Sequence, residues 1–323
     1  MTRSFLAFIL VILPLSVVLS QWPMSNDTTF DTRVNSPAYA IGKGPKIGLD
    51  AAHHNFFIQW DFIQPFFDLA KADGYVPIVG HSEFTPHYLD QFDILMIITA
   101  LPFDFTTKNE VSNESTFSVE EINSLYDWVS GGGSLLVFSE HAPFDQAINP
   151  LLHKFGITSS IGYTIDTAHF DKKIGRTGWI EFSTGNGTLN REHPIIQGRK
   201  PSERINKLLS FGGSGLSGEG YSNLLRLAES SENVMHATGV GPFGKGDSQG
   251  LAGTIGKGKV VAFGDANGFT AMLFDTEDRS KPADGIVQNY EAEHLAKQAA
   301  GMNLAAYDWR QFVLNTLHWL SAK

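Results

Sequence analysis

The sequence contains no cysteine, and this absence removes several classes of chemistry. Disulfide bonds, thiolate nucleophiles, iron–sulfur clusters and cysteine-based zinc sites are all excluded, as is a lipid-modified N-terminal cysteine. Any catalytic step must therefore use side-chain oxygen or nitrogen atoms.

Positive charge is also scarce. The 24 lysines and arginines are outnumbered by 34 aspartates and glutamates, which gives a formal net charge of −10 and a pI near 5.5. A nucleic-acid-binding protein needs a basic surface that neutralises phosphates, and this composition does not favour one. We therefore expect no binding to DNA, RNA or anionic membranes.

The N-terminal residues have the pattern of a targeting segment. Arg3 supplies positive charge, residues 5–19 are almost wholly apolar, and small residues precede Gln21. Signal peptides share this pattern, and the apolar run is short for a membrane span of ~20 residues. We expect residues 1–20 to be a signal peptide, the mature protein to be secreted or periplasmic, and no stable span to persist after cleavage. The alternative is an uncleaved signal anchor.

Residues 21–44 are polar and lack apolar periodicity, which predicts a flexible lead-in. Three glycosylation sequons begin at Asn26, Asn113 and Asn186. They matter only in a host that glycosylates secreted proteins, and chance is the simpler explanation for them.

From Pro45 onward the chain has the composition of one large domain. Its 323 residues are 42% hydrophobic and 18% charged, enough for a sizeable core, and more than ~250 residues still fit a single α/β domain. No internal repeat or low-complexity tract is present. We expect the domain to cover residues 45–323, with insertions at residues 156–200 and 273–302.

Apolar runs and amphipathic segments alternate along this domain. Strands are predicted over residues 46–50, 75–79, 92–99, 134–138, 249–255 and 259–263. Helices are predicted over residues 56–72, from the capping box at Ser118 to the stop at residues 131–133, and over residues 146–155 and 309–320. This alternation indicates an α/β fold with a mostly parallel sheet. Residues 156–199 predict β-rich excursions or loops, and residues 275–298 a long surface loop that is helical in part.

Polar residues gather where the predicted strands end, and ligands of open parallel sheets bind beyond that edge. The residues that follow strands are Asp50, His53, His54 and Asn55; Thr99 and Pro102; Ser139, Glu140 and His141; and Asp265, Asn267 and Thr270. Because the winding should place these loops side by side, we expect one shared crevice.

Histidine is the natural acid/base of this crevice, because imidazole titrates near working pH. The predicted catalytic residues are His141 or His53, with Glu140 or Asp50 orienting the ring. The predicted ligand-binding residues are His54, Asn55, Ser139, Asp265 and Asn267. Structural roles are the alternative: Asp50 as a cap or loop acceptor, Glu140 as a carboxylate at a helix N-terminus.

Two further chemistries are weaker on sequence grounds. Ser139 occupies a strand-to-helix turn but lacks the flanking glycines of a nucleophile elbow. His53, His141 and Asp265 are candidate ligands of a divalent metal, yet no spacing matches a strong metal motif such as His-Glu-x-x-His. The sequence therefore does not identify a cofactor.

Several segments together resemble the class I glutamine amidotransferase-like domain of uncharacterised exported proteins, a domain distantly similar to one in gliding-motility and ABC-transport auxiliary proteins. The resemblance covers most of residues 46–320 and rests on residues 50–55, 92–95, 128–132, 140–144, 193–195, 198–199, 258–265 and 315–320. It implies a flavodoxin-like, doubly wound sheet and places Ser139 and Glu140 where true amidotransferases carry a catalytic cysteine. Because that cysteine is missing, glutamine hydrolysis by thiolate chemistry is ruled out.

Two functions follow as hypotheses. The first is a hydrolase that acts on a small polar or carbohydrate-like substrate with a His/carboxylate pair. The second is a non-catalytic module that kept the crevice and recognises a sugar or a partner protein. Fold alone does not decide between them. A pocket over a positioned His/carboxylate pair favours the enzyme, and an open, aromatic-lined surface favours the binding module.

Overall fold

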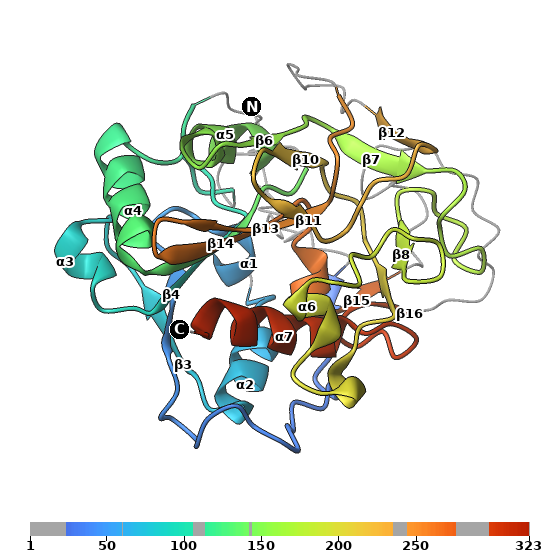
Figure 1. Ribbon diagram of the computed structural model, residues 1–323, viewed down its shortest axis with the longest axis horizontal. Helices are drawn as coiled ribbons and strands as arrows, with labels where there is room; N and C mark the ends of the chain where they lie inside the picture. Colours follow the sequence, from blue (N-terminus) through green and yellow to red (C-terminus); the bar gives the residue numbers. More distant parts are fainter. Residues whose placement is uncertain are drawn as a thin grey trace, which may run out of the picture.

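The computed structural model describes residues 24–59, 61–105, 114–141, 144–234, 244–275 and 297–322. Its centre is a seven-stranded sheet in the order β11-β13-β14-β5-β4-β2-β3 (Figure 1). Five strands are parallel: β2 (Lys46–Asp50), β3 (Val76–Gly80), β4 (Ile94–Ile98), β5 (Ser134–Phe138) and β14 (Gly258–Phe263). The other two strands join by antiparallel pairing: β13 (Gly250–Ile255) pairs with β14, and β11 (Ser222–Asn223) pairs with β13.

The order of the parallel strands determines where the winding changes direction. Numbered along the chain, they lie in the order 2-1-3-4-5, so the chain leaves β2 toward β3 on one side and returns to β4 on the other. In such sheets the crevice at this switch point is the usual place for a ligand. Here the switch point lies between β2 and β4.

Helices cover both faces of the sheet because its central strands are apolar on both sides. In β4 all five side chains are buried. Ile94, Met96 and Ile98 belong to one core, and Leu95 and Ile97 to the other. This continuous apolar run is typical of a strand buried on both faces. The predicted α/β class with a mostly parallel sheet is confirmed.

The helices divide between the two cores. α4 and α5 lie above the sheet in the view of Figure 1, and α2 and α7 lie below it. The helices are α1 (Phe56–Gln59), α2 (Gln64–Ala72), α3 (Pro86–Leu89), α4 (Val119–Gly131), α5 (Phe144–Lys154), α6 (Pro194–Gln197) and α7 (Trp309–Ser321), with short 3-10 turns η1 (Pro201–Glu203) and η2 (Asn267–Phe269).

The single helix predicted over residues 56–72 is wrong in one respect, because the structure has two helices there. Asp61, between α1 and α2, has a φ of 61°, and Pro65 lies in the first turn of α2. Proline has no N–H and clashes with the preceding turn inside a helix, but both are tolerated at a helix start. The chain therefore begins a new helix just before Pro65.

The start and end of α4 are as predicted. The Ser118 hydroxyl accepts the Glu121 N–H, the Glu121 side chain accepts the Ser118 N–H, and Gly132 ends the helix at a φ of 130°. A glycine has no Cβ to strain this conformation. Local sequence signals were sufficient here.

The polar segments are more ordered than their composition suggests. The predicted lead-in contributes β1 (Met24–Asn26), which pairs with β15 (Ala271–Asp275), and β15 pairs with β16 (Lys297–Gly301). Residues 276–296 of the predicted surface loop lie outside the described residues. Residues 157–234 form short antiparallel pairs: β6 (Ile157–Ser159) with β10 (Leu216–Gly218), β7 (Tyr163–Asp166) with β12 (Ser231–Val234), and β8 (Glu181–Ser183) with β9 (Lys207–Leu209). The β-rich excursions predicted over residues 156–199 thus appear as β6, β7 and β8, and their partner strands lie beyond that range.

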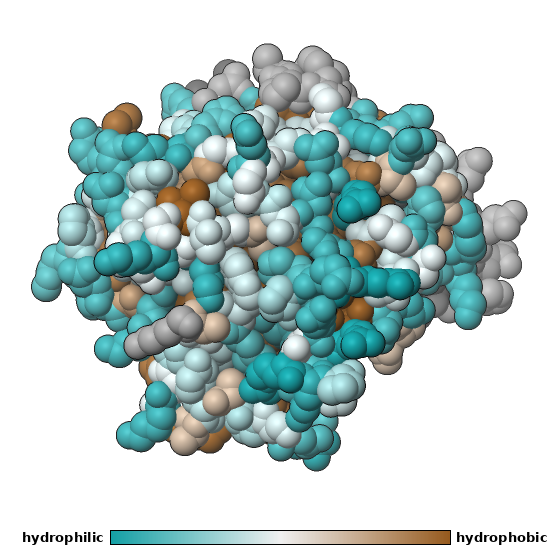
Figure 2. Space-filling view, in the orientation of Figure 1, coloured by the Kyte–Doolittle hydropathy of each residue, from teal (hydrophilic) through white to brown (hydrophobic). Residues whose placement is uncertain are grey.

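Among the described residues, no helix combines the length and apolar character that crossing a membrane requires. The predicted signal peptide and Asn113 lie outside those residues. The face shown in Figure 2 is mainly hydrophilic, with apolar residues scattered rather than gathered in one large patch.

Candidate functional site

Backbone strain gathers where the parallel strands end. Apart from Asp61, the described non-glycine residues with positive φ are His54 after β2, Thr99 after β4 and Glu140 after β5. Each such conformation costs ~1–3 kcal/mol and persists only where the surroundings enforce it. Two polar clusters occupy this edge of the sheet, one after β2 and one after β5.

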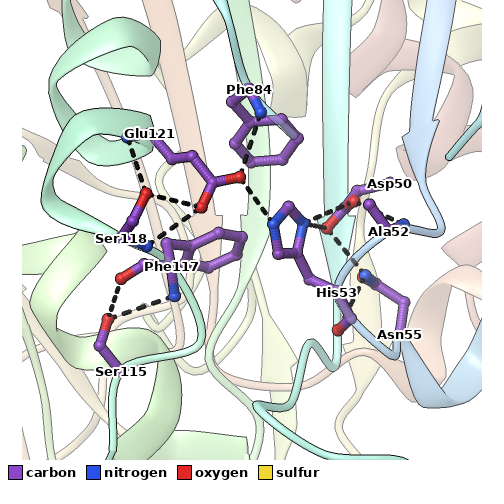
Figure 3. A network of polar contacts seen from close by, with 9 residues as sticks. All are labelled: Asp50, Ala52, His53, Asn55, Phe84, Ser115, Phe117, Ser118 and Glu121. Atoms are coloured by element: carbon purple, nitrogen blue, oxygen red, sulfur yellow. Dashed lines mark hydrogen bonds and ion pairs between the residues drawn. The ribbon is translucent and has the colours of Figure 1, made fainter. Parts of the chain in front are cut away.

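The first cluster holds the His53 ring between two carboxylates. Nδ1 lies 2.9 and 3.0 Å from the Asp50 oxygens, and Nε2 lies 2.8 Å from Oε1 of Glu121 (Figure 3). A carboxylate at each ring nitrogen suits a ring that carries hydrogen on both, because ionised carboxylates only accept hydrogen bonds. Burial alone would lower the pKa of His53, but the hydrogen bonds and charges of Asp50 and Glu121 outweigh burial and raise it.

Glu121 has two structural roles at once. Its Oε2 accepts from the Ser118 N–H and hydroxyl, which caps α4, and its Oε1 accepts from the Phe84 N–H as well as from His53. Burial raises the pKa of Glu121, but the hydrogen bonds from Ser118 and Phe84 and the charge of His53 lower it overall. The cap was visible in the sequence, whereas the contact with His53 was not, because 68 residues separate the two.

Two aromatic rings close the cluster. The centroids of Phe84 and Phe117 lie 4.8 and 4.6 Å from that of His53, which is only 9% exposed. Aromatic faces attract a cation, most strongly where water is excluded. We call Asp50, His53, Glu121, Phe84 and Phe117 the His53 clasp.

The clasp leaves the predicted catalytic role of His53 and Asp50 without support. Both nitrogens of His53 are occupied, so the ring cannot accept a proton or ligate a metal unless the clasp opens. Asn55, a predicted ligand-binding residue, is fully buried and joins β2 to β4 instead: its amide N–H donates to Asp50 and its carbonyl accepts the Ile98 N–H, each at 2.8 Å. His54 is half-buried and lies outside this network. The protein's own side chains therefore fill the switch point.

The second cluster begins where β5 ends. Ser139 is 1% exposed, and its hydroxyl lies 2.8 Å from that of Ser214. The next residue, Glu140, has a φ of 53°. The sharp turn of the chain is therefore at Glu140, and Glu140 rather than Ser139 occupies the strained position of an elbow.

Glu140 presents one oxygen without a hydrogen-bond partner. Its Oε2 accepts from the Ala266 N–H, while its buried Oε1 is unpartnered and lies 3.4 Å from Nε2 of His141. Burial, together with the charges of Asp265 and Asp145, raises the pKa of Glu140 well above its usual range. This shift favours the protonated, neutral form of the acid. The His141 side chain is 25% exposed and that of Glu140 2%, so solvent reaches the pair from the histidine side.

Two more buried carboxyls complete what we call the elbow cluster: Glu140, His141, Asp145 and Asp265. Asp265 accepts hydrogen bonds from the Ser210 hydroxyl, the Phe211 N–H, and both the N–H and side chain of Asn267. Burial raises the pKa of Asp265, and these four donors oppose that rise by stabilising its charge. Burial raises the pKa of Asp145 to about 7.

A turn of two glycines lies against the elbow cluster. Gly212 and Gly213 have φ of 107° and 99°, and a Cβ on Gly213 would lie 2.2 Å from the Gly264 carbonyl oxygen. The Gly213 carbonyl accepts from the Thr164 N–H, and Gln249 donates to the turn through its amide. The Thr164 hydroxyl and the Gln249 carbonyl oxygen are buried without partners. Native proteins pair most buried polar atoms, so such atoms commonly mark a place for water or a ligand.

The two clusters lie along the same edge of the sheet. Their loops meet through aromatic rings: Phe56 lies 5.7 Å from Phe144, which lies 6.5 Å from His141. Over the described residues, no three His, Asp or Glu side chains are placed to hold a metal ion. Among the described residues, His53, His141 and Asp265 therefore do not converge on one metal position. The predicted polar residues fall into two groups of hydrogen-bonded side chains.

A Ser–His–Asp trio elsewhere has the wrong geometry for catalysis. Nδ1 of His169 lies 3.1 Å from Asp166 and 3.3 Å from the Ser230 hydroxyl. In a catalytic triad the histidine contacts acid and nucleophile through different nitrogens. This trio instead secures the pairing of β7 and β12.

No family model matches the chain, and no curated protein matches it either. Among solved structures, the N-terminal domain of mmIFT52 is similar with a TM-score of 0.55 at 15% identity, over 86% of this chain and 98% of that chain. At this identity the likeness shows the fold alone.

Two further solved structures have TM-scores below 0.5, and no inference rests on them. A ThuA-like protein from Bacteroides uniformis has a TM-score of 0.44 at 12% identity, over 88% of this chain and 94% of that one. A cytoplasmic protein from Salmonella typhimurium has 0.45 at 10%, over 86% and 100%.

Proposed function

We propose that this chain is an exported, flavodoxin-like protein of the amidotransferase-like type that hydrolyses a small polar or carbohydrate-like substrate by acid/base chemistry. The observation that carries the proposal is the unpartnered Oε1 of Glu140, buried on a strained elbow and 3.4 Å from His141. Strain and perturbed carboxyls both concentrate at functional sites. In this proposal, Glu140 takes the position that a thiol has in amidotransferases.

The different roles of His141 and Glu140 in this proposal follow from the solvent exposure of their side chains. His141 is the partly exposed member of the pair, so it exchanges a proton with water or substrate, while Glu140 holds a proton and orients the ring. The His141 ring stacks on Tyr163 at 4.3 Å, which limits its rotation. Ser139 is a poor nucleophile because it is buried and its hydroxyl is hydrogen-bonded to that of Ser214. The predicted ligand-binding residues Asp265 and Asn267 act here by supporting the turn beside Glu140.

The test is hydrolysis of chromogenic probes of three bond types: nitrophenyl glycosides, nitrophenyl esters and amino-acid nitroanilides. We expect wild type to cleave one class and His141→Ala to lose ~100-fold or more in kcat. His87→Ala, an exposed histidine of α3, is the matched control and should retain full activity. If wild type cleaves no probe, the non-catalytic binding module becomes the better explanation. If Ser139→Ala is as damaging as His141→Ala, the mechanism uses serine.

Export is a separate part of the proposal. The apolar run ends before Gln21, so secreted material should begin close to that residue. N-terminal sequencing checks this directly. Exported protein that still begins at Met1 would support the uncleaved anchor instead.

A further inference from the structure

A hollow of about 600 Å³ lies apart from both polar clusters, between the segment that follows β1 and the segment that joins β16 to α7. We infer that this hollow is a second ligand site, which binds a sugar carrying one anionic group. The residues that argue for this ligand are Asp27, Phe30, Met302, Asn303 and Arg310, all of which line the hollow. Ligand sites commonly enclose ~300–1,000 Å³.

The walls of the hollow are anchored to the sheet formed by β1 and β15. The Asp27 N–H donates to the Ala271 carbonyl at 2.8 Å. The Asn303 amide donates to Asp27 at 3.1 Å and to the Met272 carbonyl at 3.0 Å. The two segments are therefore held at a defined separation, which a preformed site requires.

Arg310 supplies a positive charge to the hollow. In the described part of the chain, the carboxylates of Asp31, which also lines the hollow, and Asp73 act on it electrostatically without a close ion pair. Its Nε donates to the Asp31 carbonyl at 3.1 Å and its Nη2 donates to the Arg33 carbonyl. Backbone carbonyls thus orient the guanidinium, and within the described residues it forms no salt bridge, whereas the exposed Arg33 is paired with Asp31 at 2.7 Å. A guanidinium has five donors and recognises carboxylate or phosphate through two of them at once.

Other polar groups of the hollow are hydrogen-bond acceptors, which suit the hydroxyl groups of a ligand. The Oδ1 of Asn303 is buried without a hydrogen-bond partner. Burial would raise the pKa of Asp27, but hydrogen bonds from Thr29 and Asn303 lower it overall, so this carboxylate stays charged and accepts. Phe30 and Met302 add an apolar wall that suits the face of a sugar ring. An anionic group beside several hydroxyls matches this lining, and both a sugar acid and a sugar phosphate have that chemistry.

The test is calorimetric titration of the full chain with glucuronate, glucose 6-phosphate and glucose. We expect saturable binding of an anionic sugar at least ten-fold tighter than glucose, and the two anions distinguish a carboxylate from a phosphate ligand. Arg310→Gln should remove this ten-fold advantage, because glutamine lacks the charge and the paired donors of the guanidinium. Arg204→Gln, an exposed arginine that does not line the hollow, should leave binding unchanged.

A second measurement on wild type covers the case in which Arg310→Gln does not fold. Titration with the anionic sugar should shift the backbone amide resonances of Thr29 and Ala305, which line the hollow, and leave that of Glu140 in place. Equal binding of glucose, no saturable binding at millimolar concentrations, or shifts confined to the elbow cluster would each overturn the inference. Because binding is measured directly, the result is independent of whether the elbow cluster is catalytic.

Discussion

The His53 clasp and the elbow cluster contain the same kinds of groups at the same edge of the sheet, yet they are in opposite states. In the clasp, both nitrogens of His53 face carboxylates, and both oxygens of Glu121 accept hydrogen bonds. In the elbow cluster, Glu140 keeps one buried oxygen without a partner. A saturated network stabilises a fold, and an unsaturated one is available to a substrate.

The difference arises from the long-range partner of each histidine. His53 and Asp50 receive Glu121 from α4, which completes the pairing of the ring. His141 lies beside Glu140, and the neighbouring carboxyls Asp145 and Asp265 raise the pKa of Glu140 or lie buried near it instead of supplying a cation. The same residue types therefore give a closed ion network in one place and a proton-binding site in the other.

The largest expected effect is on the clasp. His53→Gln removes the cation between Asp50 and Glu121 and should destabilise the protein by ~3–5 kcal/mol, the usual cost of breaking a buried ion pair. Urea unfolding at pH 7 measures this, with the exposed His87→Gln as the matched control. A loss below ~1 kcal/mol would mean that the clasp is not a buried ion network.

The clasp also predicts how wild-type stability depends on pH. The pKa of His53 is raised in the folded state, so its contribution is present at low pH and is lost as pH rises through that pKa. The pKa of Glu121 is lowered, so its contribution is lost as pH falls through its folded pKa. The contribution of the clasp to stability should thus decline on both sides of a plateau, and His53→Gln should lack the alkaline part of that decline.

Asp145 should show the dependence opposite to that of Glu121, the carboxylate of the clasp. Its folded pKa is about 7, against an ordinary value of 3.8, so wild type loses stability as pH rises through this interval. One pKa unit corresponds to ~1.4 kcal/mol, so the loss is on the order of 4 kcal/mol. In Asp145→Asn the difference in unfolding free energy between pH 4 and pH 8 should shrink by about that amount. Asp127→Asn, an exposed residue of α4, should leave it unchanged.

Glu140→Gln should separate stability from activity. Glutamine has the shape of the neutral acid but does not titrate, so activity should fall ~100-fold. Because the pKa of Glu140 is raised, ionisation destabilises the folded protein as pH rises above the ordinary carboxyl range, and the variant should be more stable than wild type under alkaline conditions. Parallel assays of hydrolysis and unfolding check both parts. A variant that is less stable at alkaline pH would show that Glu140 is ionised and structural.

The smallest effect is expected for Ser139→Ala. It removes one hydroxyl contact with Ser214, worth ~1 kcal/mol, and Ser214 keeps its contact with Ser159 at 2.9 Å. Most activity should persist, because the elbow turns at Glu140. Thermal unfolding and probe hydrolysis measure the two effects, and Ser159→Ala is a matched control that breaks the other end of the same hydroxyl chain.

Much of the fold was predictable because its signals are local. The central strands were found as continuous apolar runs, and α4 was bounded by Ser118, Glu121 and Gly132 within one short segment. The break between α1 and α2 was missed because the apolar spacing continues across it, although Pro65 was a visible warning. The pairing of β1 with β15 was not predictable, since about 250 residues lie between partners such as Ser25 and Leu273 and polar strands carry weak periodicity.

The amino-acid sequence by itself determined which residues come after each strand, and so placed Asp50, His53, Glu140 and His141 at one edge. Run length and periodicity are short-range properties, and they require no knowledge of distant segments. Only the tertiary structure decided which histidine is held between two carboxylates. Glu121 reaches His53 across 68 residues, and burial beside distant carboxyls raises the pKa of Glu140. Charge and desolvation depend on distances through space, which no spacing along the chain contains.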